Sequence, residues 1–319
     1  MSAAAAYGGC CLPSAPDCGA QSTAAQLPQP DRLRSLLEHD FVTLGGGLFR
    51  MGSDAVDCIP GNGEGPARDV WLSPFGLAAA TVTNAQFGAF VRATHHVTDA
   101  ERVGSSFVFW LQLPEPLRQQ AQPVSRRIPW WIEVLDACWQ RPEGLGSHIA
   151  ERPDHPVVHV SWHDAQAYCR WAACRLPSEA EWEFAARGGM AGTRYSWGDA
   201  SPFAPSPRCN IWRGGFPDAP APDWPVGTVV ALAFDPNPFG LHNMLGNVWE
   251  WCEDWFDPAY HGITSSADPL QQKTSGQRSL RGGSFLCHDS YCNRYRVSAR
   301  TGNTALTTAS NIGFRVARS

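Results

Sequence analysis

Two cysteines near the end of the chain, Cys287 and Cys292, are separated by four residues in the stretch RGGSFLCHDSYCNRYR. In an extended strand, side chains five positions apart point to opposite faces, so the intervening HDSY must turn if the two sulfurs are to meet. Asp289 and Ser290 are residue types that favour turns. A pair that meets could be a disulfide, a soft metal site or a reactive couple, and the spacing alone leaves all three open.

The ligand chemistry of such a pair is soft. Two thiolates without a nearby carboxylate or paired imidazole suit Cu(I), whose filled d shell accepts two sulfurs. Three neighbouring cations, Arg281, Arg294 and Arg296, would favour the thiolate form if the fold brings them close. A disulfide, or two thiols with no special role, accounts for the same spacing.

Composition excludes several classes of function. The 319 residues include 25 basic and 30 acidic ones, which disfavours nucleic-acid binding because phosphate contacts need a concentrated cationic face. No apolar run approaches the roughly 20 residues that span a bilayer, so no membrane partner is expected. Eleven cysteines are too few for a disulfide scaffold and form no CxxC pair of pairs. Because no Lys or Arg precedes Arg32, the N-terminus fits neither a secretory nor a mitochondrial signal, and we expect a cytoplasmic protein.

The elements that must position the cysteines are few helices and many short strands and loops. The 30 Gly, 26 Pro and 14 Trp residues predict a loop-rich fold around buried aromatics. Capping residues and apolar spacing predict helices that begin near Thr83, Ser161 and Ser178, the last ending at Gly188. Residues 1–38, which lack any apolar period, are predicted to be a disordered tail, and residues 39–319 a single α+β domain.

The last quarter of the chain resembles the formylglycine-generating enzymes, also called sulfatase-modifying factors, in RGGSFLCHDSYCNRYR, SAR and SNIGFRVA. Further matches run in order from about residue 40 and include TNAQFGAFV, RLPSEAEWEFAARGG, CNIW and GNVWEWCEDWF. The resemblance implies one domain related to C-type lectins. LPSEAEWEFAARGG and GNVWEW are shared across the wider fold superfamily, whereas the segment with the two cysteines distinguishes the formylglycine branch.

What the resemblance implies is a copper-dependent oxidase that uses O2 and an external thiol reductant. It would convert a cysteine in a Cys-x-Pro-x-Arg segment of an unfolded sulfatase to Cα-formylglycine. Cu(I) would be held by both cysteines, and Trp130 would form a wall of the peptide groove. The candidate catalytic residues are Cys287, Cys292, Ser284, Asn311, Tyr291 and His288. A structural hydrogen bond explains His288 equally well.

The resemblance also implies two structural calcium sites, because that ion prefers hard oxygen ligands. The first would use Asn243, Gly246, Val248 and Glu250. The second would use Asn210, Ile211, Asp223 and Pro225. The linking segment GGFPDAPAPDWPVGT is one residue shorter than in the family and lacks its acidic-glycine turn, which argues against the second site. A polar turn with a buried glutamate explains the first segment without a metal.

Two other functions stay open. An iron-dependent sulfoxide synthase of the same fold would carry an N-terminal helical domain with histidine ligands, whereas His39 is the one histidine before the shared domain. A non-catalytic lectin-like binding module would have no reason to keep the cysteines together with Ser284 and Asn311. Cys169 matches one half of a family disulfide whose other half is Val316 here, which agrees with a reducing cytoplasm. We expect a monomer.

Overall fold

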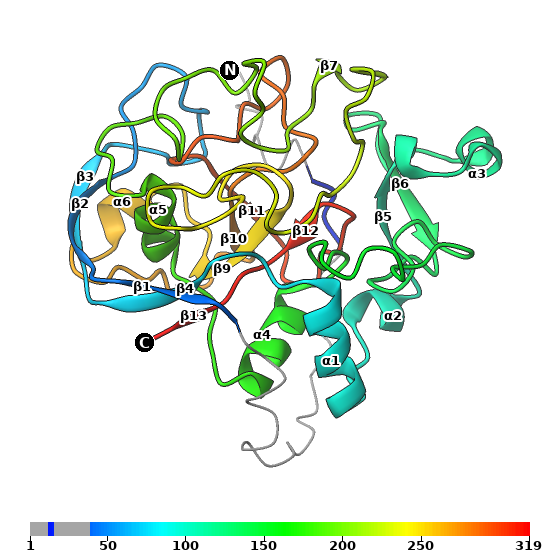
Figure 1. The fold of residues 1–319 in the computed structure, drawn as a ribbon, viewed down its shortest axis with the longest axis horizontal. Coiled ribbons are helices and arrows are strands. Elements are labelled where there is room, and N and C mark those ends of the chain that lie inside the picture. The colour runs from blue at the N-terminus through cyan, green and yellow to red at the C-terminus, as the bar shows by residue number, and fades with distance from the viewer. Residues whose placement is uncertain (1–11, 16–38) are drawn as a thin grey trace, which may run out of the picture.

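The computed structural model describes residues 12–15 and 39–319 as short strands and few helices joined by long irregular connections (Figure 1). The helices are α1 (Asn84–Thr94), α2 (Asp99–Val103), α3 (Glu115–Gln120), α4 (Trp162–Trp171), α5 (Glu179–Arg187) and α6 (Tyr260–Ile263), with the 3-10 turn η3 (Trp110–Gln112). The first strands are β1 (Phe41–Leu44), β2 (Gly47–Met51), β3 (Arg68–Leu72), β4 (Phe75–Ala78), β5 (Ser105–Phe109) and β6 (Trp131–Leu135). The later strands are β7 (Gly214–Gly215), β8 (Ala219–Pro220), β9 (Trp249–Trp255), β10 (Arg278–Arg281), β11 (Arg300–Asn303), β12 (Ile312–Gly313) and β13 (Ala317–Arg318).

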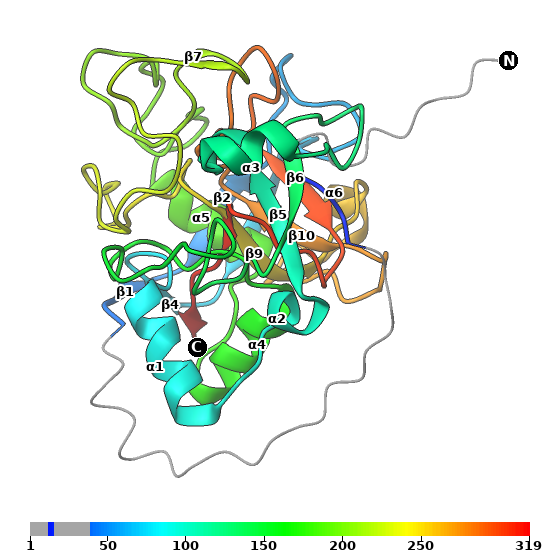
Figure 2. The same ribbon diagram turned by 90° about the vertical axis from the view of Figure 1, so that its right-hand side faces the viewer.

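The central sheet has the strand order β11-β10-β9-β12, in which β12 runs parallel to β9 and the other pairs are antiparallel. A second sheet, β1-β4-β13, joins strands from both ends of the domain. The β5–β6 pair and α3 lie at the right-hand side of Figure 1, the side that faces the viewer in Figure 2. This arrangement confirms the predicted α+β fold with few helices and much irregular structure.

The three predicted helices form, and each begins with the expected cap. Thr83, Ser161 and Ser178 each accept a hydrogen bond from the backbone three residues on, and that residue's side chain returns the bond. Such reciprocal capping satisfies N–H groups that a helix leaves without a partner. Gly188 ends α5 in a left-handed conformation, which glycine adopts at little cost. Short α2, α3 and α6 were not predicted, because each offers too few residues for a periodic pattern.

A network of buried arginines and carboxylates lies behind the central sheet. Arg281 and Arg187 both bind Glu183, and Arg300 binds Glu179. Burial alone would raise the pKa of Glu183, but Arg187 and Arg281 lower it to about 2. Since Arg281 is the last residue of β10, this network fixes the start of the loop that carries the two cysteines.

A four-residue segment of the predicted tail packs onto the domain. Leu12 is only 3% exposed, and the Asn303 amide donates to the Pro13 carbonyl at 2.8 Å. Ser14 donates to the Asn303 side chain at 2.6 Å. The rest of the predicted tail lies outside the described residues. Within the part of the chain that the structure describes, no helix is both long and apolar enough to cross a membrane.

Candidate active site

Cys287 and Cys292 meet at the loop that follows β10. The backbone N–H groups of Tyr291 and Cys292 both donate to the His288 carbonyl, at 3.1 and 2.9 Å, and close the turn over HDSY. A side-chain hydrogen bond joins the two thiols, which are 0% and 4% exposed. The sequence required a turn for this contact, and the structure contains it.

Burial is the largest cause that raises the pKa of the Cys287 thiol well above its ordinary range, and Cys292 acts in the same direction. The Ser284 N–H, 3.4 Å from Cys287 Sγ, and the Arg294 guanidinium oppose this rise without overcoming it. The expected help from Arg281 and Arg296 is absent because both bind buried carboxylates. A cation bound between the sulfurs would favour the thiolates that the pair alone does not.

Ser284 and Asn311 lie next to the thiols, as the Ser284 N–H contact with Cys287 requires. The Asn311 Nδ2 donates to Ser284 Oγ at 2.9 Å, and both residues are fully buried. The Asn311 carbonyl accepts from the Trp249 N–H at 2.8 Å, which ties this residue to the central sheet. Among the described residues, Asn311 Oδ1 has no hydrogen-bond partner. A buried acceptor without a partner is costly, so this oxygen is available to a bound molecule.

Three half-buried aromatic rings form a wall beside the cysteines. The Tyr291 ring stacks on Phe216 with centroids 4.9 Å apart, and Trp130 meets both edge-on, at 4.8 Å from Tyr291 and 5.1 Å from Phe216. The sequence singled out Trp130 and Tyr291 but not Phe216, which lies in the Pro-rich segment without any periodic signal. Partly exposed rings at this spacing offer an apolar surface to a peptide.

The His288 side chain contacts other residues of the HDSY turn. Its Nδ1 lies 2.8 Å from Ser290 Oγ and 3.1 Å from Asp289 Oδ1, and its ring packs against Phe203 at 5.6 Å. These contacts fit the structural hydrogen bond that the sequence left open.

The two cysteines are a suitable ligand set for a soft monovalent ion. Among residues 12–15 and 39–319, no three or more His, Cys, Asp and Glu side chains are grouped to hold a metal. A linear two-sulfur site needs no third ligand, and thiolate sulfur is the donor that Cu(I) prefers. The pair therefore fits copper better than calcium, zinc or iron.

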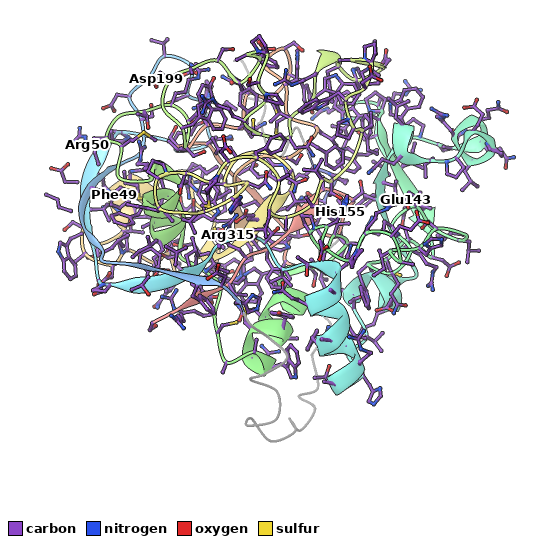
Figure 3. All side chains as sticks on the ribbon, in the orientation of Figure 1. Phe49, Arg50, Glu143, His155, Asp199 and Arg315 are labelled. Atoms are coloured by element: carbon purple, nitrogen blue, oxygen red, sulfur yellow. The ribbon has the colours of Figure 1, made fainter. Side chains whose placement is uncertain are left out.

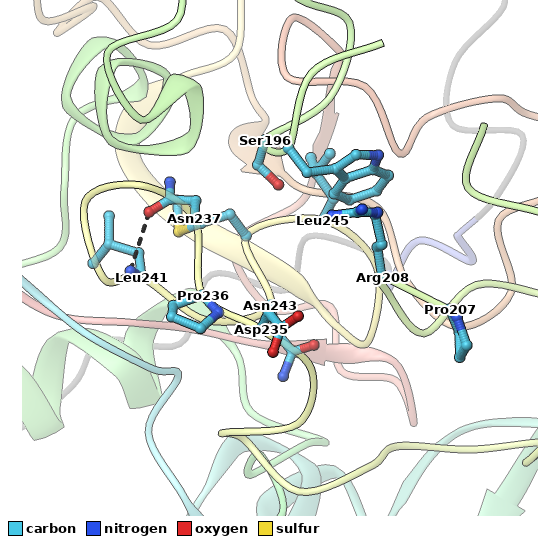
Figure 4. Close-up of a pocket in the computed structure, with 11 residues that line it drawn as sticks. Ser196, Pro207, Arg208, Asp235, Pro236, Asn237, Leu241, Asn243 and Leu245 are labelled. Carbon is cyan, nitrogen blue, oxygen red and sulfur yellow. Dashed lines mark hydrogen bonds between the residues drawn. The ribbon is translucent and has the colours of Figure 1, made fainter. Parts of the chain in front are cut away.

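The first predicted calcium site fits that ion only in part. Asn243 Nδ2 donates to the Ala231 carbonyl at 2.9 Å, while its buried Oδ1 has no partner among the described residues. Asn243 lines a small pocket together with Asp235 and Asn237 (Figure 4). Glu250, by contrast, accepts from Arg315 with both carboxylate oxygens, at 2.7 and 2.8 Å. Figure 3 shows Arg315 in the interior of the molecule. A cation here would use Asn243 and backbone carbonyls and would compete with Arg315 for the glutamate.

The second predicted site is weaker. Asn210 Oδ1 is buried without a partner in the described chain, which suits a cation. The Ile211 carbonyl, however, accepts from Trp224 Nε1 at 2.7 Å, and Asp223 and Pro225 are exposed. Of the four residues named for this doubtful site, only Asn210 thus offers a buried oxygen without a partner among the described residues.

The described domain is an α+β fold of the lectin-related type with a buried dithiol in the loop after β10. A family model described as "Sulfatase-modifying factor enzyme 1-like domain" matches residues 26–319. A formylglycine-generating enzyme of Streptomyces coelicolor is 53% identical over 277 residues, covering 86% of this chain and 88% of that protein. One of Thermomonospora curvata is 50% identical over 292 residues, covering 90% and 96%. The structure of PvdO from Pseudomonas aeruginosa aligns with a TM-score of 0.62 at 24% identity, over 88% of this chain and 94% of that chain, and supports the fold alone.

This chain belongs to the family of formylglycine-generating enzymes, the sulfatase-modifying factors.

Proposed function

We propose that this protein is a copper-dependent oxidase that converts a cysteine of an unfolded sulfatase, within a Cys-x-Pro-x-Arg segment, to Cα-formylglycine. In the overall reaction, the substrate CH2–SH group, O2, two electrons and two protons give the aldehyde, H2S and water. An external thiol supplies the two electrons. The observation that supports this function most strongly is the buried, hydrogen-bonded pair Cys287 and Cys292 beside the aromatic wall.

Cys287 and Cys292 would hold Cu(I), and copper bound there would supply the centre at which O2 is reduced. The protein's own residues do the rest. Tyr291, Trp130 and Phe216 bind the apolar part of the peptide and exclude water from the thiols. Asn311 Oδ1 accepts a hydrogen bond from the bound substrate or a water, and Ser284 Oγ, held by Asn311 Nδ2, orients the polar group that reacts.

Three further properties belong to the same proposal. Ca2+ is a structural ion bound at Asn243, whose buried side-chain oxygen has no hydrogen-bond partner among the described residues. The enzyme works as a monomer in the cytoplasm, with the sulfatase polypeptide as its partner. A thiol reductant in that compartment also keeps the catalytic cysteines reduced.

The test uses the full chain loaded with one equivalent of Cu(I), in air with a thiol reductant. A peptide containing Leu-Cys-Thr-Pro-Ser-Arg should exchange its sulfur for an aldehyde oxygen, which its mass and reaction with a hydroxylamine probe report. A peptide with Ala in place of Cys is the substrate control. Cys287→Ala should abolish turnover, whereas Cys138→Ala, at a buried cysteine outside the site, should retain it.

An unchanged peptide with folded, copper-loaded protein would exclude this substrate. Turnover that survives Cys292→Ser would exclude the two-sulfur copper site, and folded protein that binds the peptide without changing it would favour a binding module. Activity that requires iron rather than copper would favour the hypothesis of an iron-dependent sulfoxide synthase.

A further inference from the structure

A second pair of cysteines, Cys169 and Cys174, repeats the spacing of the active-site pair at the end of α4. The Cys174 N–H donates to the Cys169 carbonyl at 3.0 Å, and Ala173 between them has a left-handed φ of 50°. This is the helix ending in which the chain turns back and closes a six-residue loop. In that ending, the residue two positions beyond the cap commonly contacts a residue of the last helical turn, and here both are cysteines.

This helix ending brings the two side chains together, and both burial and the neighbouring Cys174 raise the pKa of the Cys169 thiol. Cys169 is 1% exposed and Cys174 is half-buried. Tyr168, Arg170, Arg175 and Glu253 are ionisable neighbours of Cys169. Neither thiol is joined to another cysteine of residues 12–15 and 39–319. Solvent thus reaches Cys174, while Cys169 is buried beside it. This is the arrangement of an attacking thiol and a resolving thiol.

We propose that Cys169 and Cys174 are a redox modification site, which a low-molecular-weight disulfide oxidises to an intrachain disulfide. The Cys174 sulfur attacks the small disulfide, forms a mixed disulfide and releases one thiol. The Cys169 sulfur then attacks Cys174, forms the intrachain bond and releases the second thiol. Two electrons pass from the pair to the small disulfide, and the two thiol protons pass to the two released thiols.

This bond would fasten one end of α4 to the C-terminal part of the fold. Immediately after Cys174, Arg175 pairs with Ala317 of β13 through two backbone bonds, at 2.9 and 2.7 Å. Arg175 also binds Glu181 at 2.6 and 2.7 Å, which links it to the cap of α5. A disulfide at this junction closes a loop whose ends are already held, so it lowers the entropy of the unfolded chain with little change in the folded one.

The sequence offers a direct readout. Trypsin cleaves after Arg170 and after Arg175, so it separates the two cysteines into different peptides. We would incubate the full chain with glutathione disulfide, block the remaining thiols with an alkylating agent and digest it without reduction. We expect one species in which the Cys169 and Cys174 peptides are joined, and a melting temperature raised by about 2–4 °C. A reductant should reverse both changes.

Cys174→Ala and Cys169→Ala should each remove the cross-linked species and the reductant-sensitive shift, whereas Cys209→Ala, at a buried cysteine elsewhere, should keep both. The mass assignment on the unaltered chain needs no variant, so a misfolded variant does not decide the result. Cys169 and Cys174 that both remain alkylated, or a glutathione adduct that persists on Cys174, would overturn the proposal. Neither outcome depends on whether the protein oxidises sulfatases.

Discussion

Asn311 Nδ2 donates to Ser284 Oγ at 2.9 Å, although the two residues come from different loops at opposite edges of the central sheet's β9–β10 pair. β12 begins at the next residue and pairs with β9, while Ser284 follows the end of β10. The bond therefore holds the loop after β10 against the sheet and at the same time fixes both buried side chains beside each other. The first prediction follows from this double role.

Ser284→Ala should reduce turnover by on the order of 10², the usual loss when an active site loses one oriented hydroxyl or donor. The melting temperature should change little, because the hydroxyl makes few other contacts. Single-turnover kinetics with the cysteine peptide and a melting curve check this together. Ser290→Ala, at an exposed position of the same loop, is the matched control. Equal losses in both variants would mean that the loop's integrity matters rather than the hydroxyl.

Phe216→Ala should raise KM for the peptide about fivefold with kcat nearly unchanged, since the ring binds substrate through apolar contact worth roughly 1 kcal/mol. The measurement is steady-state kinetics over a peptide series. Phe203→Ala changes a ring that packs on the outer side of the loop, against His288, and should leave KM unaffected. A loss confined to kcat would argue that Phe216 positions Tyr291 instead of contacting substrate.

Copper binding gives a test that does not depend on activity. Competition between the protein and a Cu(I) chelator should yield one tightly bound ion per chain. Cys287→Ala and Cys292→Ala should both lose it, because one remaining sulfur cannot complete a linear site. Cys169→Ala should bind copper normally. Retention of the ion by either active-site variant would place copper elsewhere in the protein.

Asn243→Ala should remove the stabilisation that added Ca2+ provides, since Asn243 Oδ1 is the buried acceptor oxygen at that site. Melting temperatures with Ca2+ and with a chelator measure the difference. An Asn210→Ala variant tests the second site. We expect its Ca2+-dependent rise in melting temperature to equal that of the unaltered chain. A Ca2+ response that persists in Asn243→Ala would move the ion away from this loop.

Glu183→Gln should cost about 3–5 kcal/mol of the free energy of unfolding at neutral pH, because it leaves Arg187 buried without its counter-charge and Arg281 with only Glu179, at 3.8 Å. The folded pKa of Glu183, about 2, lies below the ordinary 4.5. Its contribution is therefore fully present above pH 4.5 and is lost as pH falls toward 2. Urea unfolding at a series of pH values should show the variant and the parent chain converging in acid. Glu115→Gln, at an exposed pair, should cost at most about 1 kcal/mol.

Local features of this protein can be predicted from the sequence, whereas contacts between segments far apart in the chain cannot. The caps at Thr83, Ser161 and Ser178 involve residues three positions apart, and the turn between the active-site cysteines spans four. Phe216 reaches Tyr291 only through the path of a long irregular segment, which has no period to reveal it. Arg296 was expected near the thiols from its position, but Glu64, far away in the chain, binds it. Residues far apart in the sequence, such as Glu64 and Arg296, therefore determine which charges act on the site.

β13 has a consequence for how the protein is made. β13 pairs with β4, so the sheet is complete only once residues near 317 have been synthesised, long after those near residue 77. During synthesis β4 therefore presents an open edge, with the buried residues Phe75 and Leu77, for most of the time the ribosome spends on the domain. An open apolar edge of this kind favours pairing with other chains, so slower synthesis, which lengthens its exposure, should lower the yield of folded protein.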